Sequence, residues 1–123
     1  MPQDEADDDL DDGIDWADLQ SFFYEDLETK MADLEMGLGE GDCTKLFRIG
    51  HSIKGSGGGV KLPIYTELGK HLETAGKAND LEASRTACAA IRDEYLKSHP
   101  DRAEKYSTYF RKPGEELKRA SGF

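Results

Sequence analysis

The chain has 123 residues, enough for one domain whose core holds together without disulfides or a metal ion. Hydrophobic residues make up 37% of it and charged residues 34%, which suits a small helical protein better than a sheet-rich one. No run of 18 apolar residues predicts a membrane span, and no basic patch or stripe predicts binding to nucleic acid.

The chain starts with a strongly acidic segment. Residues 1–15 hold eight acidic residues and no basic one, so the remaining 108 residues carry a net charge of only −2. So polar a segment cannot bury enough apolar surface to fold, and we predict a disordered acidic head over residues 1–14. A specific acidic recognition tail is the alternative interpretation. The segment has no apolar stretch of the kind that marks a signal peptide, so we expect a cytoplasmic protein.

The first helix is predicted from about Trp16 to Leu38. Its apolar residues recur at steps of four, four, three and four, which draws one stripe: Phe23, Leu27, Met31, Leu34 and Leu38. Asp15 is the expected N-cap, because its carboxylate can accept a hydrogen bond from a free backbone N–H of the first turn. The segment Gly39-Glu40-Gly41 is expected to end the helix.

Two further helices follow after short turns. Asp42 is the expected cap of the second helix, which runs to about Gly59. Its stripe is Leu46, Gly50, Ile53, Gly57 and Val60. The third helix is predicted over residues 62–77, with Pro63 in the first turn, where the missing N–H has no consequence. Its stripe is Ile64, Leu68, Leu72 and Ala75.

Either Asn79 or Asp80 is expected to cap a fourth helix that ends near Lys97. Its stripe is Leu81, Ala87, Ile91 and Tyr95. Pro100 interrupts it, residues 101–110 are again helix-like, and residues 113–123 are expected to form a frayed tail. The sequence therefore predicts an all-α protein, an antiparallel four-helix bundle with possible short accessory helices at its ends, whose domain spans residues 15–112.

The cysteines and two of the histidines form no recognisable site. Cys43 and Cys88 lie 45 residues apart without a CxxC pair, so we expect reduced thiols. No ligand spacing repeats among the histidines and cysteines, so no metal site is predicted. His71 and His99 have no partner pattern and are interpreted as surface residues.

The glycine-rich run over residues 50–61 carries most of the information. It does not fit the phosphate-binding loop G-x-x-x-x-G-K-[ST], because no lysine follows that pattern. It does not fit the dinucleotide fingerprint G-x-G-x-x-G either, since Val60 stands at the last position and no strand precedes the run. The run is therefore read as part of a helix.

On that helix, His51 is predicted to lie away from the apolar stripe and to face solvent. Gly55 and Gly58 lie beside His51 at i+4 and i+7, which leaves a bare patch next to an exposed imidazole, and Lys54 is one turn away. Neutral imidazole is a good nucleophile near pH 7, and phosphoryl transfer depends on positioning and on cationic stabilisation. A surface histidine without function, beside a flexible helix end, is the alternative interpretation.

The segment His51-Ser52-Ile53-Lys54-Gly55-Ser56 resembles the H-x-[IL]-K-G-[ST/A] signature of histidine phosphotransfer domains. Leu72-Glu73 is similar to the Leu-Glu pair of the family's next helix, and residues 38–42 resemble its preceding acidic turn. The resemblance covers about residues 16–97. It implies a four-helix bundle in which His51 accepts a phosphoryl group on its outer ring nitrogen.

The resemblance also implies roles for neighbouring residues. Lys54 matches the lysine that stabilises the phosphoryl group, and Glu73 matches a position that orients the imidazole ring, although a solvated surface charge is the alternative for Glu73. The small residues at the implied docking face are Gly55, Ser56 and Gly58. Lys61 departs from the family, which often has glycine there. Since a positive φ is unfavourable for lysine, the turn after this helix is expected to differ locally from the family's.

The implied function is that of a monomeric phosphoryl carrier without turnover of its own. Its partners would be a sensor histidine kinase and a response-regulator receiver domain, which supplies the acid pocket and Mg²⁺, so no cofactor is expected on this chain. Two alternatives remain: the phosphorylated input domain of a chemotaxis-type kinase, and an adaptor that binds a receiver without being phosphorylated.

Overall fold

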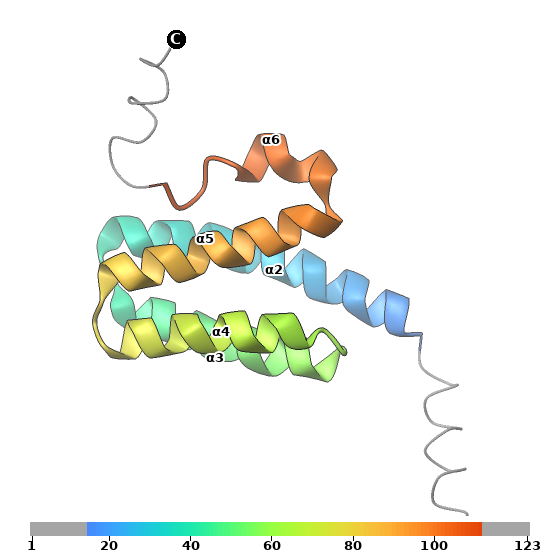
Figure 1. Cartoon of the computed structure of the whole chain (residues 1–123), viewed down its shortest axis with the longest axis horizontal. Helices are drawn as coiled ribbons and strands as arrows, with labels where there is room; N and C mark the ends of the chain where they lie inside the picture. Colours follow the sequence, from blue (N-terminus) through green and yellow to red (C-terminus); the bar gives the residue numbers. More distant parts are fainter. Residues whose placement is uncertain (1–14, 112–123) are drawn as a thin grey trace, which may run out of the picture.

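The computed structural model describes residues 15–111. They form helices α2 (Trp16–Glu40), α3 (Cys43–Gly59), α4 (Pro63–Lys77), α5 (Leu81–Ser98), η1 (Pro100–Arg102) and α6 (Ala103–Tyr106) (Figure 1). The four long helices alternate in direction and pack as a bundle, which confirms the predicted fold class. None of the helices in this range combines the length and apolar character that a membrane crossing requires. The predicted acidic head and frayed tail lie outside the described residues.

Three aspartates start helices as the sequence predicts. The side chains of Asp15, Asp42 and Asp80 accept hydrogen bonds from the backbone N–H three residues further on, at 3.2, 3.0 and 3.0 Å. Asn79, the other candidate cap, takes a left-handed conformation (φ 60°) just after α4. The end predicted for the first helix is two residues short, because α2 passes through Gly39 and stops where Gly41 adopts φ 69°.

The predicted apolar stripes form most of the core. All five stripe residues of α2 are buried, and so are Leu46 and Ile53 of α3 and Ile91 and Tyr95 of α5. The stripe predicted for α4 is partly wrong, because Ile64 is 43% exposed and Tyr65 is buried in its place. Gly69 and Gly76 of α4 explain this rotation, because they lie on the same side of the helix as Tyr65 and bring that side against α3.

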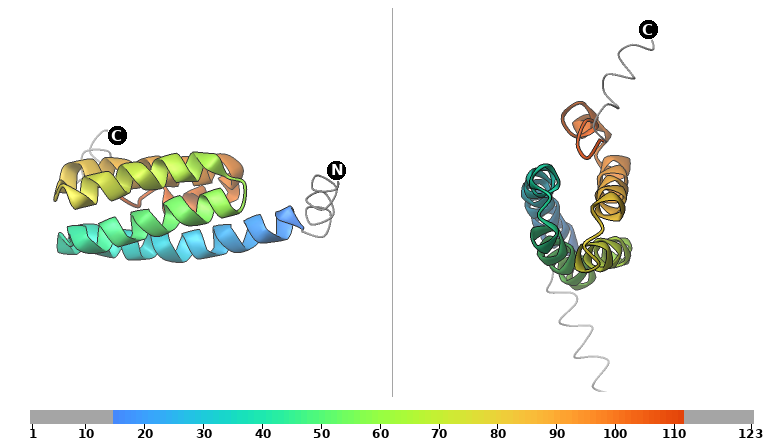
Figure 2. Two further views of the ribbon diagram at one scale, coloured as in Figure 1. Left: turned by 90° about the horizontal axis from the view of Figure 1, so that it is seen from below. Right: turned by 90° about the vertical axis from the view of Figure 1, so that its left-hand side faces the viewer.

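Glycines allow α3 and α4 to approach each other closely. A Cβ atom built on Gly50 would lie 2.7 Å from the backbone N of Glu73, and one on Gly57 would lie 2.7 Å from Cβ of Tyr65. On the facing helix, a Cβ atom on Gly69 would lie 2.5 Å from the backbone N of Lys54. The fourth glycine, Gly76, meets the backbone of Phe47 in the same way. Seen from below in Figure 2, these two helices lie side by side in front of the rest of the bundle.

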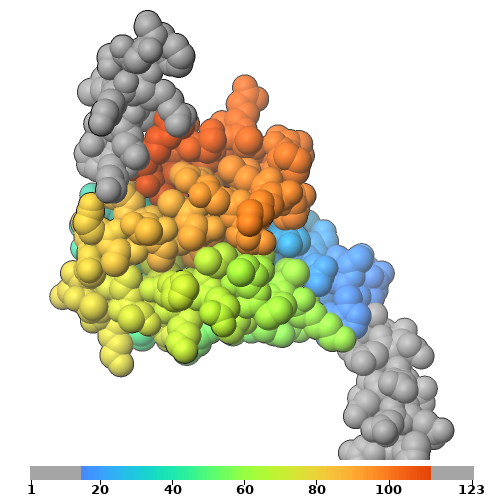
Figure 3. Space-filling view, viewed as in Figure 1, coloured from blue at the N-terminus to red at the C-terminus, as the bar shows by residue number. Residues whose placement is uncertain are grey.

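The C-terminal segment closes the side of the bundle between α2 and α5. The backbone N–H of Phe110 donates to Glu35 of α2 at 2.8 Å, while Arg85 and Arg92 of α5 donate to the backbone carbonyls of Arg111 and Tyr109. Figures 2 and 3 show the segment lying along α5. The helix predicted over residues 101–110 is shorter than expected, because Phe110 turns inward with φ 66° and is 2% exposed.

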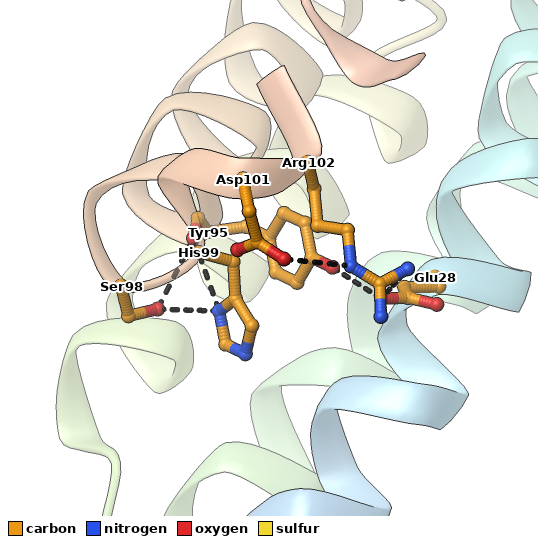
Figure 4. Close-up of polar contacts among 6 residues, drawn as sticks. All are labelled: Glu28, Tyr95, Ser98, His99, Asp101 and Arg102. Carbon is orange, nitrogen blue, oxygen red and sulfur yellow. Dashed lines mark hydrogen bonds and ion pairs between the residues drawn. The ribbon is translucent and has the colours of Figure 1, made fainter. Parts of the chain in front are cut away.

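His99 is not the plain surface residue that the sequence suggests. Its ring stacks on Tyr95 at 4.5 Å with an interplanar angle of 10° and meets the ring of Tyr24 edge-on at 4.4 Å. Figure 4 shows this ring beside the Tyr95 side chain, whose hydroxyl points toward α2 and donates to Glu28. His99 therefore belongs to the packing that joins the end of α5 to α2.

Lys61 occupies the turn between α3 and α4 and adopts φ 62°, so the expectation that lysine avoids a positive φ here is wrong. Its ammonium lies 4.4 Å from the centre of the Trp16 ring. A left-handed conformation costs a side-chain-bearing residue about 1–2 kcal/mol, a cost that glycine avoids. We therefore expect Lys61→Gly to be more stable than Lys61→Ala by about 1 kcal/mol, although both remove the ammonium. Urea unfolding of the two variants measures this difference. Greater stability of the alanine variant would contradict a positive φ at this position.

Candidate functional site

The candidate site lies where α3 and α4 touch on the outside of the bundle. His51 is on α3 with its side chain 65% exposed, and Glu73 is on α4 with its side chain 17% exposed. The Nδ1 atom of His51 lies 2.7 Å from Oε2 of Glu73. The structure thus brings together two of the predicted site residues that are 22 positions apart in the sequence.

Lys54 completes a three-residue cluster. Its Nζ atom donates to Oε1 of Glu73 at 2.8 Å, so one carboxylate binds the imidazole with one oxygen and the ammonium with the other. These hydrogen bonds, first that of Lys54 and then that of His51, lower the pKa of Glu73 below its ordinary value. Glu73 is therefore ionised at neutral pH, and the alternative of an isolated solvated charge is wrong.

The close helix contact explains why the cluster forms. Because Gly50 precedes His51 and meets the backbone of Glu73, no side chain separates the two helices at this level. Gly69 gives the same close approach at Lys54, and Thr66 donates from Oγ1 to the carbonyl of Lys54 at 3.1 Å. The short backbone separation lets a glutamate on one helix reach two side chains on the other.

The protonation of the imidazole follows from its partner. A carboxylate only accepts hydrogen bonds, so the Nδ1 atom of neutral His51 carries the proton and the Nε2 atom keeps a lone pair. With the side chain 65% exposed, that lone pair is available to an incoming group. Nε2 is therefore the ring nitrogen from which a nucleophilic attack would come.

The surface next to the imidazole is bare, as predicted. Gly55 and Gly58 are exposed; a Cβ atom at Gly55 would meet nothing within 4 Å, and one at Gly58 would meet only Oγ1 of Thr66. Ser56 is half-buried, and its hydroxyl forms no hydrogen bond within residues 15–111. A docking role for these three residues stays a prediction.

Sequence reasoning missed two features of the site. The Phe47 ring lies one turn before His51, with 6.5 Å between ring centres and an interplanar angle of 25°. Gly69 and Gly76 were not recognised as contact residues, although their spacing of seven equals that of Gly50 and Gly57 on α3. Within the described part of the chain, no group of three or more histidine, cysteine or acidic side chains is arranged to hold a metal ion.

Comparison with known proteins agrees with the fold and the position of the cluster. The family model of the Hpt domain matches residues 18–99, which include all three residues of the cluster. Searches of curated proteins and of solved structures found no match. A helical bundle with this match defines a phosphotransfer protein of two-component signalling. The chain belongs to the Hpt domain family.

Removing the Glu73 carboxylate should disturb the imidazole rather than the fold. In Glu73→Ala the preference for Nδ1–H is lost, and we expect phosphoryl acceptance to slow about tenfold, the order expected for one hydrogen bond to a charged group. Glu73→Gln keeps an acceptor oxygen and should recover part of the rate. Imidazole ¹⁵N shifts, which distinguish the tautomers, measure the cause directly. Unchanged shifts in Glu73→Ala would contradict the positioning role.

Proposed function

We propose that this protein is a phosphorelay intermediate that carries a phosphoryl group on Nε2 of His51. The donor would be the aspartyl phosphate of a receiver domain or a sensor histidine kinase, and the acceptor a response-regulator receiver. The observation that carries the proposal is the hydrogen bond of 2.7 Å between Nδ1 of His51 and Glu73, which leaves Nε2 unprotonated and directed outward.

In the proposed step, the lone pair of Nε2 attacks phosphorus while the bond from phosphorus to the aspartyl oxygen breaks. The leaving carboxylate keeps the bonding electron pair, and the positive charge that develops on the imidazole is balanced by Glu73. Lys54 lies beside the ring through its contact with Glu73 and would stabilise the phosphoryl oxygens. The reverse attack by a second aspartate returns His51 to its starting state.

The other components of the proposal follow from the same chemistry. The protein would act as a monomer in the cytoplasm, where its two buried free cysteines stay reduced. Mg²⁺ would be bound by the partner receiver domain, and this chain would need no cofactor. Gly55, Ser56 and Gly58 would lie at the docking face, where the absence of large side chains lets the receiver pocket approach the ring.

The test is transfer from a panel of phosphorylated receiver domains to the wild-type chain. We expect label that is stable in base and labile in acid, with a ³¹P signal of a phosphoramidate, and fragmentation should locate it at His51. A receiver that binds the chain tightly without labelling it would replace the carrier by a binding-only adaptor. Label only from a kinase domain, never from a receiver, would favour the input domain of a chemotaxis-type kinase.

A further inference from the structure

Phe47 is an aromatic residue whose position the core does not explain. It lies on α3 and is half-buried. Within residues 15–111 it belongs neither to the buried core nor to the partly buried apolar side chains that pack against that core. The ring contact that it makes is with His51. Phe47 therefore belongs to the site rather than to the interior of the bundle.

The Phe47 ring and the imidazole of His51 are almost parallel. The two residues are four positions apart on α3, and side chains of a helix lean toward its N-terminus, so the His51 side chain extends over the turn that carries Phe47. The ring centres are 6.5 Å apart and the ring planes differ by 25°, an offset-stacked arrangement within the range of aromatic pairs. Phe47 thus presents a flat apolar surface to the imidazole.

Helix α4 fixes the turn of α3 from which the Phe47 ring projects. A Cβ atom built on Gly76 would lie 2.7 Å from the backbone N of Phe47 and 2.9 Å from its Cα, so backbone packs on backbone at this level. Gly50 makes the same kind of contact with the backbone of Glu73. One helix contact therefore holds the backbone of Phe47 and that of Glu73 relative to each other.

Glu73 alone does not fix the orientation of the imidazole. Its hydrogen bond of 2.7 Å restrains Nδ1, an atom at the edge of the ring, and leaves the ring free to tilt about that atom. The His51 side chain is 65% exposed, so water surrounds much of the ring. A nearly parallel aromatic ring opposes the tilt. Tilting in one direction forces ring atoms together, and tilting in the other direction gives up their van der Waals contact.

We infer that Phe47 is a positioning residue, which keeps the imidazole of His51 in the orientation where Glu73 binds Nδ1 and Nε2 is directed outward. The hydrogen bond holds the ring at its edge, and Phe47 holds it by stacking. Phe47 acts through His51 and takes no part in the bonds that form or break. The orientation does not depend on phosphoryl transfer, whereas its effect on the transfer rate rests on the proposed function.

Ring motion in the unphosphorylated, full-length chain tests the orientation. Phe47→Leu keeps an apolar side chain but loses the flat ring. In this variant we expect the ¹³C order parameters of the His51 imidazole to fall by about a third or more, toward the values of flexible groups. Phe47→Tyr keeps the ring and should keep the wild-type order parameters. Wild-type order parameters in a folded Phe47→Leu would overturn the inference.

The effect on rate is measured with a donor that needs no docking surface. Phosphoramidate is a small donor whose P–N bond breaks as Nε2 bonds to phosphorus, while ammonia leaves with the bonding electron pair. We expect Phe47→Leu to be labelled about two- to tenfold more slowly than wild type, the ratio that corresponds to the loss of one aromatic pair. Phe47→Tyr should recover the wild-type rate. Phe22→Leu removes an exposed ring from α2 and should leave the rate unchanged.

A phosphorylated receiver domain as second donor separates positioning from docking. Slow transfer to Phe47→Leu from the receiver, with labelling from phosphoramidate at the wild-type rate, would make Phe47 a docking residue and overturn the inference. If neither donor labels the wild type, the proposed function fails, and the order parameters still decide whether Phe47 orients His51. Slower labelling from both donors together with a more mobile ring, both restored in Phe47→Tyr, is the expected result.

Discussion

His51→Gln is expected to abolish phosphoryl transfer while leaving the bundle folded. Glutamine has no nitrogen lone pair that can act as a nucleophile, because its amide nitrogen only donates hydrogen bonds. The His51 side chain is 65% exposed, and its polar contact within residues 15–111 is with Glu73. The loss should therefore be complete in a transfer assay, with a melting temperature within a few degrees of wild type.

A matched substitution separates loss of the nucleophile from loss of docking. His71→Gln removes a different exposed histidine, from α4, and should transfer at the wild-type rate. Binding of both variants to the same receiver, measured by titration, should match that of wild type. Label that persists in His51→Gln would place the acceptor elsewhere and refute the assignment of His51.

Gly69→Ala should produce the largest change in stability. The new Cβ atom would lie 2.5 Å from the backbone N of Lys54 and 2.8 Å from the carbonyl oxygen of Gly50. Neither is the end of a flexible side chain, so α3 and α4 must move apart. Overpacking of this kind costs about 1–3 kcal/mol or more. In a domain of about 100 residues, each kcal/mol lowers the melting temperature by roughly 4–8 °C.

Gly55→Ala is the control for this substitution, because it adds the same methyl group to the same pair of helices. A Cβ atom there meets nothing within 4 Å, so only helix propensity changes and the variant should be more stable by about 0.5–1 kcal/mol. Denaturant unfolding measures both free energies. Equal effects of the two substitutions would show that the close contact of α3 and α4 does not limit stability.

Local signals predicted most of the fold. The three aspartate caps and the stripe of α2 depend on residues within one or two turns of each other, so the sequence contains all that determines them. The choice between Ile64 and Tyr65 depends instead on how α4 rotates against α3. Apolar periodicity favours Ile64, because it does not count glycine as a contact residue. Paired glycines seven residues apart on both helices were the available signal.

The candidate site was predicted residue by residue but not as a geometry. The motif and its spacing pointed to His51, Lys54 and Glu73. That the Glu73 carboxylate binds both other side chains depends on how α3 and α4 pack, which the sequence does not show. His99 was misjudged for the same reason. Its aromatic partner Tyr24 is on α2, 75 positions earlier in the chain, and no local sequence pattern predicts such a contact.

The glycines of α3 make its folding depend on α4. Five of its 17 residues are glycine, and each costs about 1 kcal/mol relative to alanine in a helix, so the isolated segment would not be helical in water. The amide protons of α3 should therefore exchange with solvent only when α4 separates from it, and the two helices should open as one cooperative unit. Any ligand that holds α4 in place also holds His51 in its contact with Glu73.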